Sequence, residues 1–493
     1  MSPLDELTKL RRDKLEILRK RNTPAYAYSF KISHRSKEIL ESADALQSAN
    51  ETISVAGRLM SKRGHGKASF SHIKDFLGKI QVYFREDEVG EEAYALFDLL
   101  DVGDIVGVRG KVFKTKTGET TVKAEELVLL TKSLTPLPEK WHGLKDVETR
   151  FRRRYVDLIV NDFVRDTFVM RGKVLTAMRR FLDSKGFTEV ETPILQPIYG
   201  GAFAKPFTTR HEALERRLYL RVSDELYLKR LIVGGFEKVY EIGKDFRNEG
   251  MDKLHSPEFT MMELYEAYSD YLDMMTLLEE MVCSILMEVK GSTVCEFDSQ
   301  NIDFKPPWRR IGFFDSLKEK TGLDLLDMDE KSTRKACLQF GIEVGEKAGY
   351  GKMVDELFSS VIQPGLIQPT CVIDYPKDLS PLAKEKRGNP KVVERFELFA
   401  GGLELANSFS EQNDPTEQEK QFERQAALRE KGDVEAQVMD RDFISALECG
   451  MPPTGGLGVG IDRLVMLFSN VGNIREAILF PPVRNEIEEE GSE

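Results

Sequence analysis

Charged and aromatic side chains recur at every second position in the stretch FRNEGMDKLHSPEFTMMELY, residues 246–265. If residues 239–249 and 257–265 pair as antiparallel strands, alternation places one set of these side chains on a common face. That set comprises Arg247, Glu249, Phe259, Glu263 and Tyr265, and the loop between the strands holds His255. Arginine grips carboxylates and phosphates, phenylalanine offers a base a flat surface, and a carboxylate beside a phenol suits an ammonium group. The face predicts either a ligand site or a solvated sheet surface with structural ion pairs.

A second segment, RFELFAGGLELANSFSEQND, places Glu397 and Glu404 on either side of a Gly-Gly turn. Two carboxylates that a hairpin brings together are costly to ionise unless a cation lies between them. Magnesium carried by a nucleotide is such a cation. The strand after the turn alternates Asn407, Phe409 and Glu411, and their small neighbours leave room for a ligand.

A third segment, TGGLGVGIDRLVMLF, alternates Gly456, Gly458 and Gly460 with apolar residues. Glycines at every second position flatten one face of a strand, so that another body can lie against it. Arg463 then opens an apolar helix, where its charge adds to the helix dipole and favours a phosphate. The segment lacks the Gly-Lys-Ser/Thr ending of a Walker A loop and has no Rossmann context.

Residues 51–135 contain about five short alternating strands and one short helix, EEAYALFDLLD. In GKIQVYFR, the apolar residues Ile80, Val82 and Phe84 share one face, which places Gln81 on the solvated face. This pattern predicts a small closed barrel of the oligonucleotide-binding type, an OB-fold.

A charged helical extension, residues 1–50, is expected before the barrel. Its basic helix over 5–21 is either a solvated helix or an arm that touches a polyanion. Residues 136–150 form a proline-bearing linker to a larger domain over 151–485. That domain opens with a long amphipathic helix ending at Gly186, and antiparallel strand pairs and helices follow. A helical insertion is expected near 300–370 and a disordered acidic tail over 486–493.

The composition of the chain argues against some classes of protein. The net charge of −12 argues against wholesale coating of nucleic acid, but it permits a local basic face. The N-terminus has no apolar core of signal-peptide length, and the chain has no run of about 18 apolar residues, so we expect a cytoplasmic protein without membrane or DNA partners. The five cysteines form no CxxC pair, which favours reduced thiols over a zinc site or a disulfide framework.

Taken together, the segments resemble the class II aminoacyl-tRNA synthetases. KGFTEVETPIL, with Pro193, is similar to motif 1, FRNE with its loop to motif 2, and GLGVGIDRLVML to motif 3. Longer peptides such as ELYLKRLIVGGFEKVYEIGKDFRNEG, PEFTMMELYEAYSDY and LIQPTCVIDYPKDLSPLAK resemble the bacterial-type lysyl-tRNA synthetases, from about residue 52 to 484. The resemblance implies an α+β protein: an N-terminal OB-fold barrel that binds the anticodon, then a catalytic domain built on a mainly antiparallel sheet flanked by helices.

The resemblance also implies residue roles. Arg247 would bind the α-phosphate of ATP and the carboxylate of lysine, and Arg463 the γ-phosphate. The remaining ATP positions are Glu249, His255 and Phe259, with Glu397 and Glu404 as magnesium ligands. The lysine positions are Gly201 and Glu225 for the α-amino group, Glu263 as a further carboxylate, Tyr265 and Glu411 for the ε-ammonium, and Asn407 and Phe409 as lining. In the barrel, Arg63, Phe70 and Gln81 would hold the central anticodon uridine of tRNA(Lys), and motif 1 implies a homodimer.

Lysine selection agrees with the chemistry of these residues. A buried ammonium needs a carboxylate and further acceptors, whereas an aspartate pocket would need a cation that the LANSFSE strand lacks. Phe70 shares a strand face with His72 and Lys74, as in a stacking platform for a single-stranded base, although an ordinary half-buried strand residue has the same pattern. For the dimer, the apolar stripe that includes Val174 and Met178 is compatible with an interface or with an internal core.

Three positions depart from the family pattern. Ser256 stands where asparagine is usual, Ser223-Asp224 where Ala-Pro is common, and Ser408 where glycine is common. None removes a proposed charge, so we expect activity with altered affinity. Two rival interpretations remain, a lysyl-protein ligase on the same catalytic domain and a catalytically inactive RNA-binding paralogue. The intact barrel argues against the first, and the retained Arg247, Glu397, Glu404 and Arg463 argue against the second.

Overall fold

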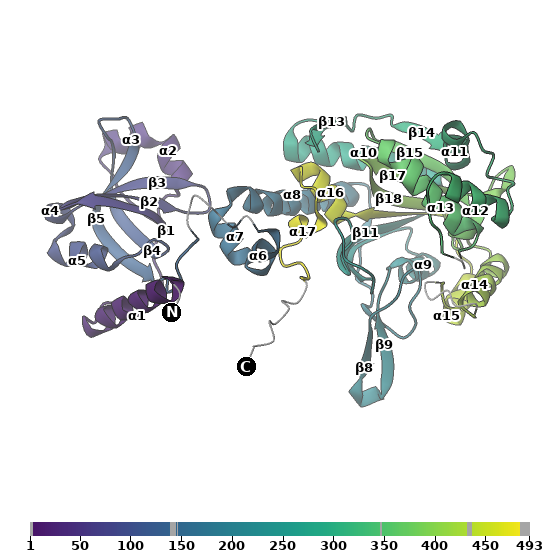
Figure 1. Ribbon diagram of the computed structural model, residues 1–493, viewed down its shortest axis with the longest axis horizontal. Coiled ribbons are helices and arrows are strands. Elements are labelled where there is room, and N and C mark those ends of the chain that lie inside the picture. The colour runs from purple at the N-terminus through teal and green to yellow at the C-terminus, as the bar shows by residue number, and fades with distance from the viewer. Residues whose placement is uncertain (1–2, 139–143, 145, 346–347, 431–435, 484–493) are drawn as a thin grey trace. The chain divides into compact units, whose positions relative to one another are not determined.

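The computed structural model describes residues 3–138, 144, 146–345, 348–430 and 436–483. The chain divides into two compact units, Met1–Lys145 and Asp146–Glu493 (Figure 1). The expected acidic tail over 486–493 lies outside the described residues, as does part of the expected linker. Each unit is described by itself.

The first unit is a closed five-stranded barrel, as predicted. Its strands are β1 (Thr52–His65), β2 (Ala68–Lys74), β3 (Lys79–Arg85), β4 (Ile105–Lys114) and β5 (Thr120–Thr131), in the order β1-β2-β3-β5-β4. Ile80, Val82 and Phe84 point into the barrel core, which confirms the period-two pattern. The short helices α4 (Glu86–Val89) and α5 (Glu91–Leu99) lie between β3 and β4.

Three helices precede the barrel: α1 (Pro3–Lys20), α2 (Ser36–Glu41) and α3 (Ala43–Ala49). Leu15 and Leu18 of α1 join the barrel core. Arg11 donates hydrogen bonds to the backbone oxygens of Val102 (2.8 Å) and Ser133 (3.2 Å). One face of the basic helix is therefore fixed to the barrel rather than fully solvated.

The second unit is built on a nine-stranded sheet that is mainly antiparallel, as expected. Along it the order is β14-β15-β17-β18-β19-β11-β10-β6, with β16 paired to β17. Only β14–β15 and β10–β6 run parallel among the described pairs of this sheet. The strands are β6 (Thr188–Glu189), β10 (Lys238–Phe246), β11 (Glu258–Ala267), β14 (Arg309–Gly312), β15 (Thr370–Pro376), β16 (Glu385–Lys386), β17 (Asn389–Ala400), β18 (Leu403–Ser410) and β19 (Thr454–Gly460).

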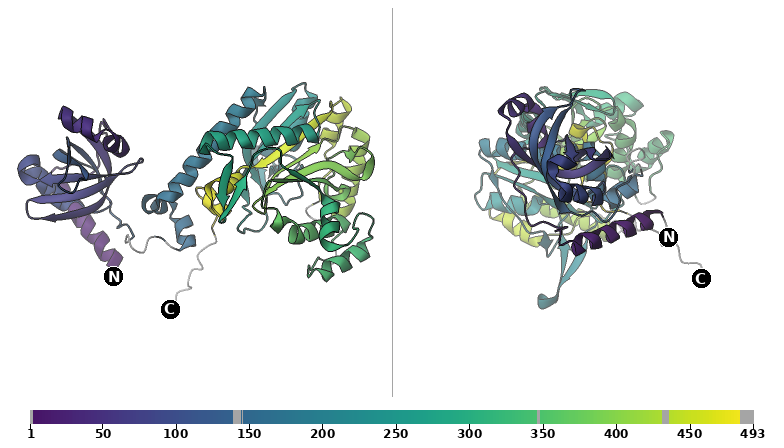
Figure 2. Two further views of the ribbon diagram at one scale, coloured as in Figure 1. Left: turned by 90° about the horizontal axis from the view of Figure 1, so that it is seen from above. Right: turned by 90° about the vertical axis from the view of Figure 1, so that its left-hand side faces the viewer.

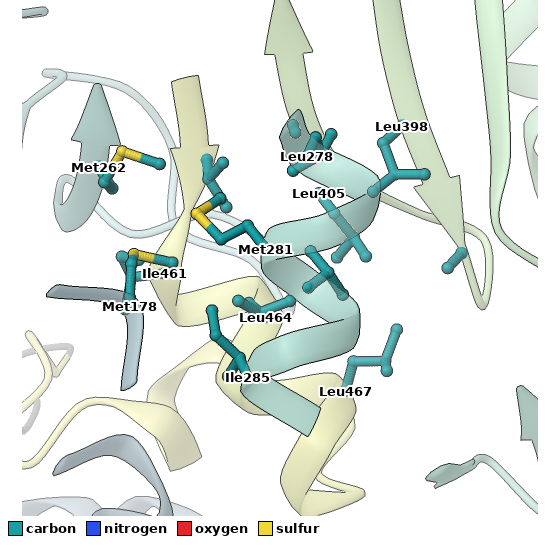
Figure 3. Packing of buried hydrophobic residues seen from close by; sticks show 14 of the residues in the cluster. Met178, Met262, Leu278, Met281, Ile285, Leu398, Leu405, Ile461, Leu464 and Leu467 are labelled. Atoms are coloured by element: carbon teal, nitrogen blue, oxygen red, sulfur yellow. The ribbon is translucent and has the colours of Figure 1, made fainter. Parts of the chain in front are cut away.

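One face of this sheet is covered by α8 (Asp162–Ser184), α10 (Tyr271–Lys290) and α16 (Ile461–Ser469). Figure 3 shows α10 side chains such as Leu278 and Met281 packed among Leu405 of β18 and Leu464 of α16. The predicted helix end is confirmed, since Gly186 adopts a φ of +82° just beyond α8.

The apolar stripe of α8 contributes to this internal core. Val174, Met178 and Leu182 are buried in it, with Leu175 and Phe181 packed against its edge. Of the two alternatives for the stripe, the structure supports the internal one. Because these side chains are packed inside the unit, they do not support a dimer interface.

The other face of the sheet carries α9 (Glu225–Val233), α14 (Pro415–Glu430) and α15 (Arg441–Glu448) around a smaller cluster that includes Tyr265 and Phe443. A three-stranded sheet, β7 (Leu195–Gln196), β9 (Arg216–Leu220) and β8 (Thr208–His211), projects beside it (Figures 1 and 2). Outside the insertion, the unit also has α6 (Val147–Arg152), α7 (Arg154–Val160) and α17 (Ile474–Ala477).

The insertion expected to be helical near 300–370 is only partly so. Its helices are α11 (Phe313–Thr321), α12 (Glu330–Gln339) and α13 (Tyr350–Val361). Its first residues instead form β13 (Gln300–Asp303), paired with β12 (Val294–Phe297), and β14 at the edge of the main sheet. Each of these strands has only four residues, the lower limit at which alternation indicates a strand, so the sequence pattern did not separate them from the helices that follow. Among the described helices, none combines the length and apolar character that a membrane crossing requires.

Candidate functional site

A cavity of about 410 Å³ opens on the sheet face opposite α10. It is bordered by β11, β17, β18, β19, the loop between β10 and β11, and the first turns of α9 and α16. All the predicted catalytic-domain site residues line this one cavity: Gly201, Glu225, Arg247, Glu249, His255, Phe259, Glu263, Tyr265, Glu397, Glu404, Asn407, Phe409, Glu411 and Arg463. The fold thus brings together residues that lie more than 250 positions apart in the chain.

The predicted antiparallel pairing is confirmed, but the first strand ends at Phe246 instead of 249, so Glu249 lies in the loop. Strands β10 and β11 pair antiparallel, with Asp245 opposite Phe259. Just beyond β10, the backbone N–H of Arg247 donates to the Pro257 oxygen at 2.9 Å. The Arg247 guanidinium lies 5.0 Å from the centre of the Phe259 ring. A forked cation and a flat aromatic surface therefore stand together at one end of the cavity, an arrangement that suits a phosphate beside a base.

Arg463 projects from the first turn of α16 toward a chain of polar groups. Its Nη1 donates to Oε2 of Glu404 at 3.1 Å, and its Nη2 donates to Nε2 of His255 at 3.2 Å. Because arginine only donates, Nε2 of His255 accepts, and Nδ1–H then donates to Asp252 at 2.8 Å. The loop histidine is thereby oriented toward a cation that can bind a phosphate.

Glu397 and Glu404 are brought to the same cavity by the β17–β18 hairpin. Its turn residues Gly401 and Gly402 adopt φ angles of +61° and +74°, a region that favours glycine. Glu397 accepts from the Tyr375 hydroxyl at 2.8 Å and is in an ion pair with Arg395. Burial, with the Glu404 charge opposing Arg395, raises the pKa of Glu397 to about 7.

These two carboxylates fit a divalent cation in donor chemistry, because a metal would relieve their repulsion. Among the described residues, no group of three or more His, Cys, Asp or Glu side chains is arranged to hold a metal alone. Magnesium would therefore need oxygens from a nucleotide as well, which is its ordinary mode of binding in nucleotide enzymes.

The opposite end of the cavity is rich in carboxylates. Glu263 accepts hydrogen bonds from the Ser223 hydroxyl at 2.9 Å and from the Tyr265 hydroxyl at 3.2 Å. Burial, together with the charges of Asp245 and Glu225, raises the pKa of Glu263 to about 8. Glu411 is buried, and its Oε1 has no hydrogen-bond partner among the described residues. Acidic groups held out of water in this way fit a cationic ligand.

The glycine alternation in β19 has a steric reason. A Cβ on Gly456 would lie 1.9 Å from Oε1 of Glu411 and 2.6 Å from Cε1 of Tyr265. Glu411 and Tyr265 therefore occupy the space that a side chain at position 456 would need. At Gly201 the backbone adopts a φ of +91°, and a Cβ would lie 2.8 Å from the Ser223 hydroxyl oxygen.

Several residues at the site were missed by sequence reasoning. Lys229 of α9 is buried and pairs with Glu225 and Glu411. Arg395 donates from Nε to the Asn407 amide oxygen at 2.9 Å. The spacing signals existed: Lys229 lies four residues after Glu225 on a helix, and Arg395 two residues before Glu397 on a strand.

Asp462 and Arg171 were missed as well. Asp462, beside Arg463, accepts from the Thr260 backbone N–H at 2.7 Å and from Nη1 of Arg171 at 2.5 Å. This buried network ties the start of α16 to β11 and α8. No local spacing links these three segments, so only the fold could reveal it.

The three unusual positions have different environments. Ser223 hydrogen-bonds to Glu263, so it adds a partner to the acidic end of the cavity. Ser408 donates to the Gly456 backbone oxygen at 2.6 Å and strengthens the β18–β19 pairing. Ser256 lines the cavity with a hydroxyl that has no hydrogen-bond partner among the described residues. Asp224 is buried close to Asp245, and burial raises its pKa to about 11.

In the barrel unit, Arg63 of β1 lies opposite Phe70 of β2 in the strand register. Phe70 is 39% exposed, and its ring centre lies 4.7 Å from that of Tyr83. The expectation that Gln81 lies on a solvated face is wrong, because its side chain is only 9% exposed. Its amide donates to Glu119 at 2.8 Å and accepts from the Thr121 hydroxyl at 2.7 Å, and these contacts cover it.

Comparison with known proteins agrees with this geometry. Residues 146–484 match the family described as tRNA synthetases class II (D, K and N), and residues 53–130 match the OB-fold nucleic acid binding domain. A lysine–tRNA ligase of Carboxydothermus hydrogenoformans is 52% identical over 482 residues, which cover 98% of each chain. A lysine–tRNA ligase of Bacillus subtilis is 49% identical over 487 residues, again 98% of each chain. This chain belongs to the class II tRNA synthetases and, within them, to the lysine–tRNA ligase family.

Proposed function

We propose that this chain activates L-lysine with ATP and transfers the lysyl group to the 3′ end of tRNA(Lys). The proposal rests on one observation: the two ends of a single cavity carry groups of opposite charge. Arg247 and Phe259 stand at one end, buried carboxylates including Glu263 and Glu411 at the other, and Arg463 borders it from α16. The sequence identity to lysine–tRNA ligases supports the choice of amino acid.

In this proposal the first step is an in-line displacement at phosphorus. A carboxylate oxygen of lysine attacks the α-phosphorus of ATP, the bond to the β-phosphate oxygen breaks, and lysyl-adenylate and diphosphate form. Arg247 binds the α-phosphate and the lysine carboxylate, while Phe259 stacks on the adenine and Glu249 and His255 contact the nucleotide. Arg463 binds the terminal phosphate, so catalysis rests on positioning and electrostatics.

Magnesium is part of the proposal, and Glu397 and Glu404 are the residues that would hold it. When bound with ATP, the ion would neutralise charge on the phosphates. Arg395 and Tyr375 hold Glu397 in place, and Arg463 contacts Glu404, so both carboxylates are preorganised.

At the amino-acid end, Glu225 and the neighbourhood of Gly201 would receive the α-ammonium of lysine. Glu411 and Tyr265 would receive the ε-ammonium, with Glu263 as a further acceptor. Asn407 and Phe409 would line the aliphatic stem. Burial of these acceptors gives selectivity, since an uncharged analogue would leave the buried groups unpaired.

In the second step the 3′-terminal hydroxyl of the tRNA attacks the lysyl carbonyl, and AMP leaves. We propose that the barrel, over residues 51–135, binds the anticodon through Phe70, Arg63 and Gln81. Exposed Phe70 supports this as a stacking surface. Because Gln81 is engaged by Glu119 and Thr121, it would have to exchange a partner to read a base.

The remaining parts of the proposal concern organisation. We propose a catalytic domain over 151–485, a helical extension over 1–50, a linker over 136–150, and a homodimer that acts in the cytoplasm. The dimer rests on the family resemblance and not on the α8 stripe, which is internal.

The test is ATP–pyrophosphate exchange with each standard amino acid, followed by charging of tRNA. The expected result is exchange that depends on lysine and charging of tRNA(Lys). No lysine-dependent exchange would refute the enzyme proposal and favour an inactive RNA-binding paralogue. Exchange without charging would favour a ligase that lysylates a different acceptor.

A further inference from the structure

Lys229 is a buried cation beside the amino-acid end of the cavity. Its side chain, in the middle of α9, is 0% exposed. The Nζ atom lies 2.6 Å from Oε1 of Glu225 and forms an ion pair with Oε2 of Glu411. Lys229 itself is not among the residues that line the cavity, so it would act through the two carboxylates.

Aromatic rings enclose the ammonium on its other sides. The Nζ atom lies 5.4 Å from the ring centre of Phe409, 5.9 Å from that of Phe443 and 6.0 Å from that of Tyr265. Aromatic faces stabilise a cation without adding formal charge. The surroundings therefore hold Lys229 in its charged form. Although burial opposes it, Glu225 and Glu411 raise the pKa of Lys229 above its usual value.

The charge count explains why a fixed cation belongs here. The carboxylates Glu225, Glu263 and Glu411 face the cavity, and they carry three negative charges when ionised. A lysine zwitterion brings only two ammonium groups, and its carboxylate is proposed to bind Arg247. With all three carboxylates ionised in the bound state, the site without Lys229 would retain one unpaired buried charge, which is costly. Burial raises the pKa of Glu225 and of Glu411, and Lys229 opposes that rise in both.

We propose that Lys229 is a positioning residue: it bridges Glu225 and Glu411 and holds both carboxylates in place to receive the two ammonium groups of the substrate. The proposal rests on the proposed function and names a residue that this function did not use. Because one lysine joins α9 to the end of β18, it also fixes the separation of the two acceptors. The other interpretation is a lysine that only stabilises the fold.

The test uses the full-length chain and the exchange reaction, which needs no tRNA. Lys229→Met keeps most of the side-chain volume and removes the charge, and Lys229→Gln keeps a hydrogen-bond donor should the Met variant fail to fold. The expected result is a KM for lysine raised about 10- to 150-fold, the effect of one charge-assisted hydrogen bond, with the KM for ATP unchanged. If Lys229 only stabilises the fold, loss of folded protein would lower the apparent kcat and leave both KM values at wild type.

A matched control exists in the barrel. Lys132 is also 0% exposed and pairs with Asp101 at 2.6 Å and Asp104 at 2.8 Å. Lys132→Met should lower the melting temperature and leave the KM for lysine in exchange at the wild-type value. If both Met variants change KM equally, Lys229 has no special role.

Chemical rescue separates charge from packing. Lys229→Ala removes the equivalent of a propylammonium ion, so added n-propylamine should lower the KM for lysine toward wild type. Neutral 1-propanol, of the same shape, should not. Equal rescue by both compounds, or a wild-type KM in the Met and Gln variants, would overturn the proposal for Lys229 alone. Absence of lysine-dependent exchange in the wild type would overturn the proposed function, and the role of Lys229 with it.

Discussion

Replacing Gly456 with alanine perturbs the ammonium end of the cavity with a single methyl group. The added Cβ would lie 1.9 Å from Oε1 of Glu411 and 2.6 Å from Cε1 of Tyr265. Both distances are well below van der Waals contact, so at least one of these side chains must move. Glu411 is restrained by its ion pair with Lys229, so its displacement also disturbs that contact.

The magnitude follows from what Glu411 is proposed to do. A shift of this size breaks one charge-assisted hydrogen bond to the ε-ammonium, which contributes about 1.5–3 kcal/mol. At about 1.4 kcal/mol per factor of ten, kcat/KM for lysine should fall roughly 10- to 150-fold. Exchange assays that vary lysine at saturating ATP, and then ATP at saturating lysine, give the KM for each substrate and so report on each end of the cavity separately.

Gly455→Ala is the matched control on the same strand. Its Cβ would lie 2.8 Å from Cγ of Met274 and 3.0 Å from the Asp270 backbone oxygen, both on the α10 side of the sheet. This variant should lower the melting temperature while the KM for lysine stays near the wild-type value. The reasoning is refuted if Gly456→Ala leaves the KM for lysine unchanged, or if it weakens ATP as much as lysine.

Three further predictions address proton linkage, tRNA and the α16 network. Burial and the Asp245 charge raise the pKa of Glu263 to about 8, so this carboxyl holds its proton at neutral pH and ionises when an ammonium binds. Lysine binding should therefore release protons, and the KM for lysine should fall as pH rises from 6.5 to 8. Calorimetry in buffers of different ionisation enthalpy checks the sign, and proton uptake would contradict it. Phe70→Ala should leave exchange intact but weaken tRNA binding by the value of one stacked base, about 1–3 kcal/mol in charging assays; unchanged tRNA affinity would count against the stacking surface. Asp462→Asn removes the charge that pairs with Arg171. Breaking such a buried pair costs about 3–5 kcal/mol, so the variant should have a lower melting temperature and a higher KM for ATP. A stable variant with unchanged ATP kinetics would show that the network does not position Arg463.

Period-two patterns in the sequence predicted much of the fold that matters for the site. The β10–β11 hairpin, the barrel strand with Ile80, Val82 and Phe84 inside, and the glycine strand β19 all follow the expected alternation. Alternation is a local property, so a single sequence reveals it. The resemblance then joined segments that local patterns could not connect.

Other features depend on tertiary packing and were missed or wrong. Gln81 alternates like a solvated residue, but Glu119 and Thr121 from a neighbouring part of the barrel cover it. The α8 stripe was ambiguous between core and interface because both require an apolar helix face. Lys229 was not identified as a site residue, because only the fold brings Glu411 to it.

The most direct test of the central claim compares L-lysine with L-norleucine in ATP–pyrophosphate exchange. Norleucine has the same aliphatic stem but lacks the ε-ammonium that Glu411 and Tyr265 are proposed to bind. A site built around buried polar acceptors rejects such an analogue by roughly 10⁴-fold or more in kcat/KM, which is the result that we predict. Activation of norleucine within about 10-fold of lysine, the discrimination expected of a merely apolar pocket, would contradict the assignment of the carboxylate end of the cavity to the ammonium groups of lysine.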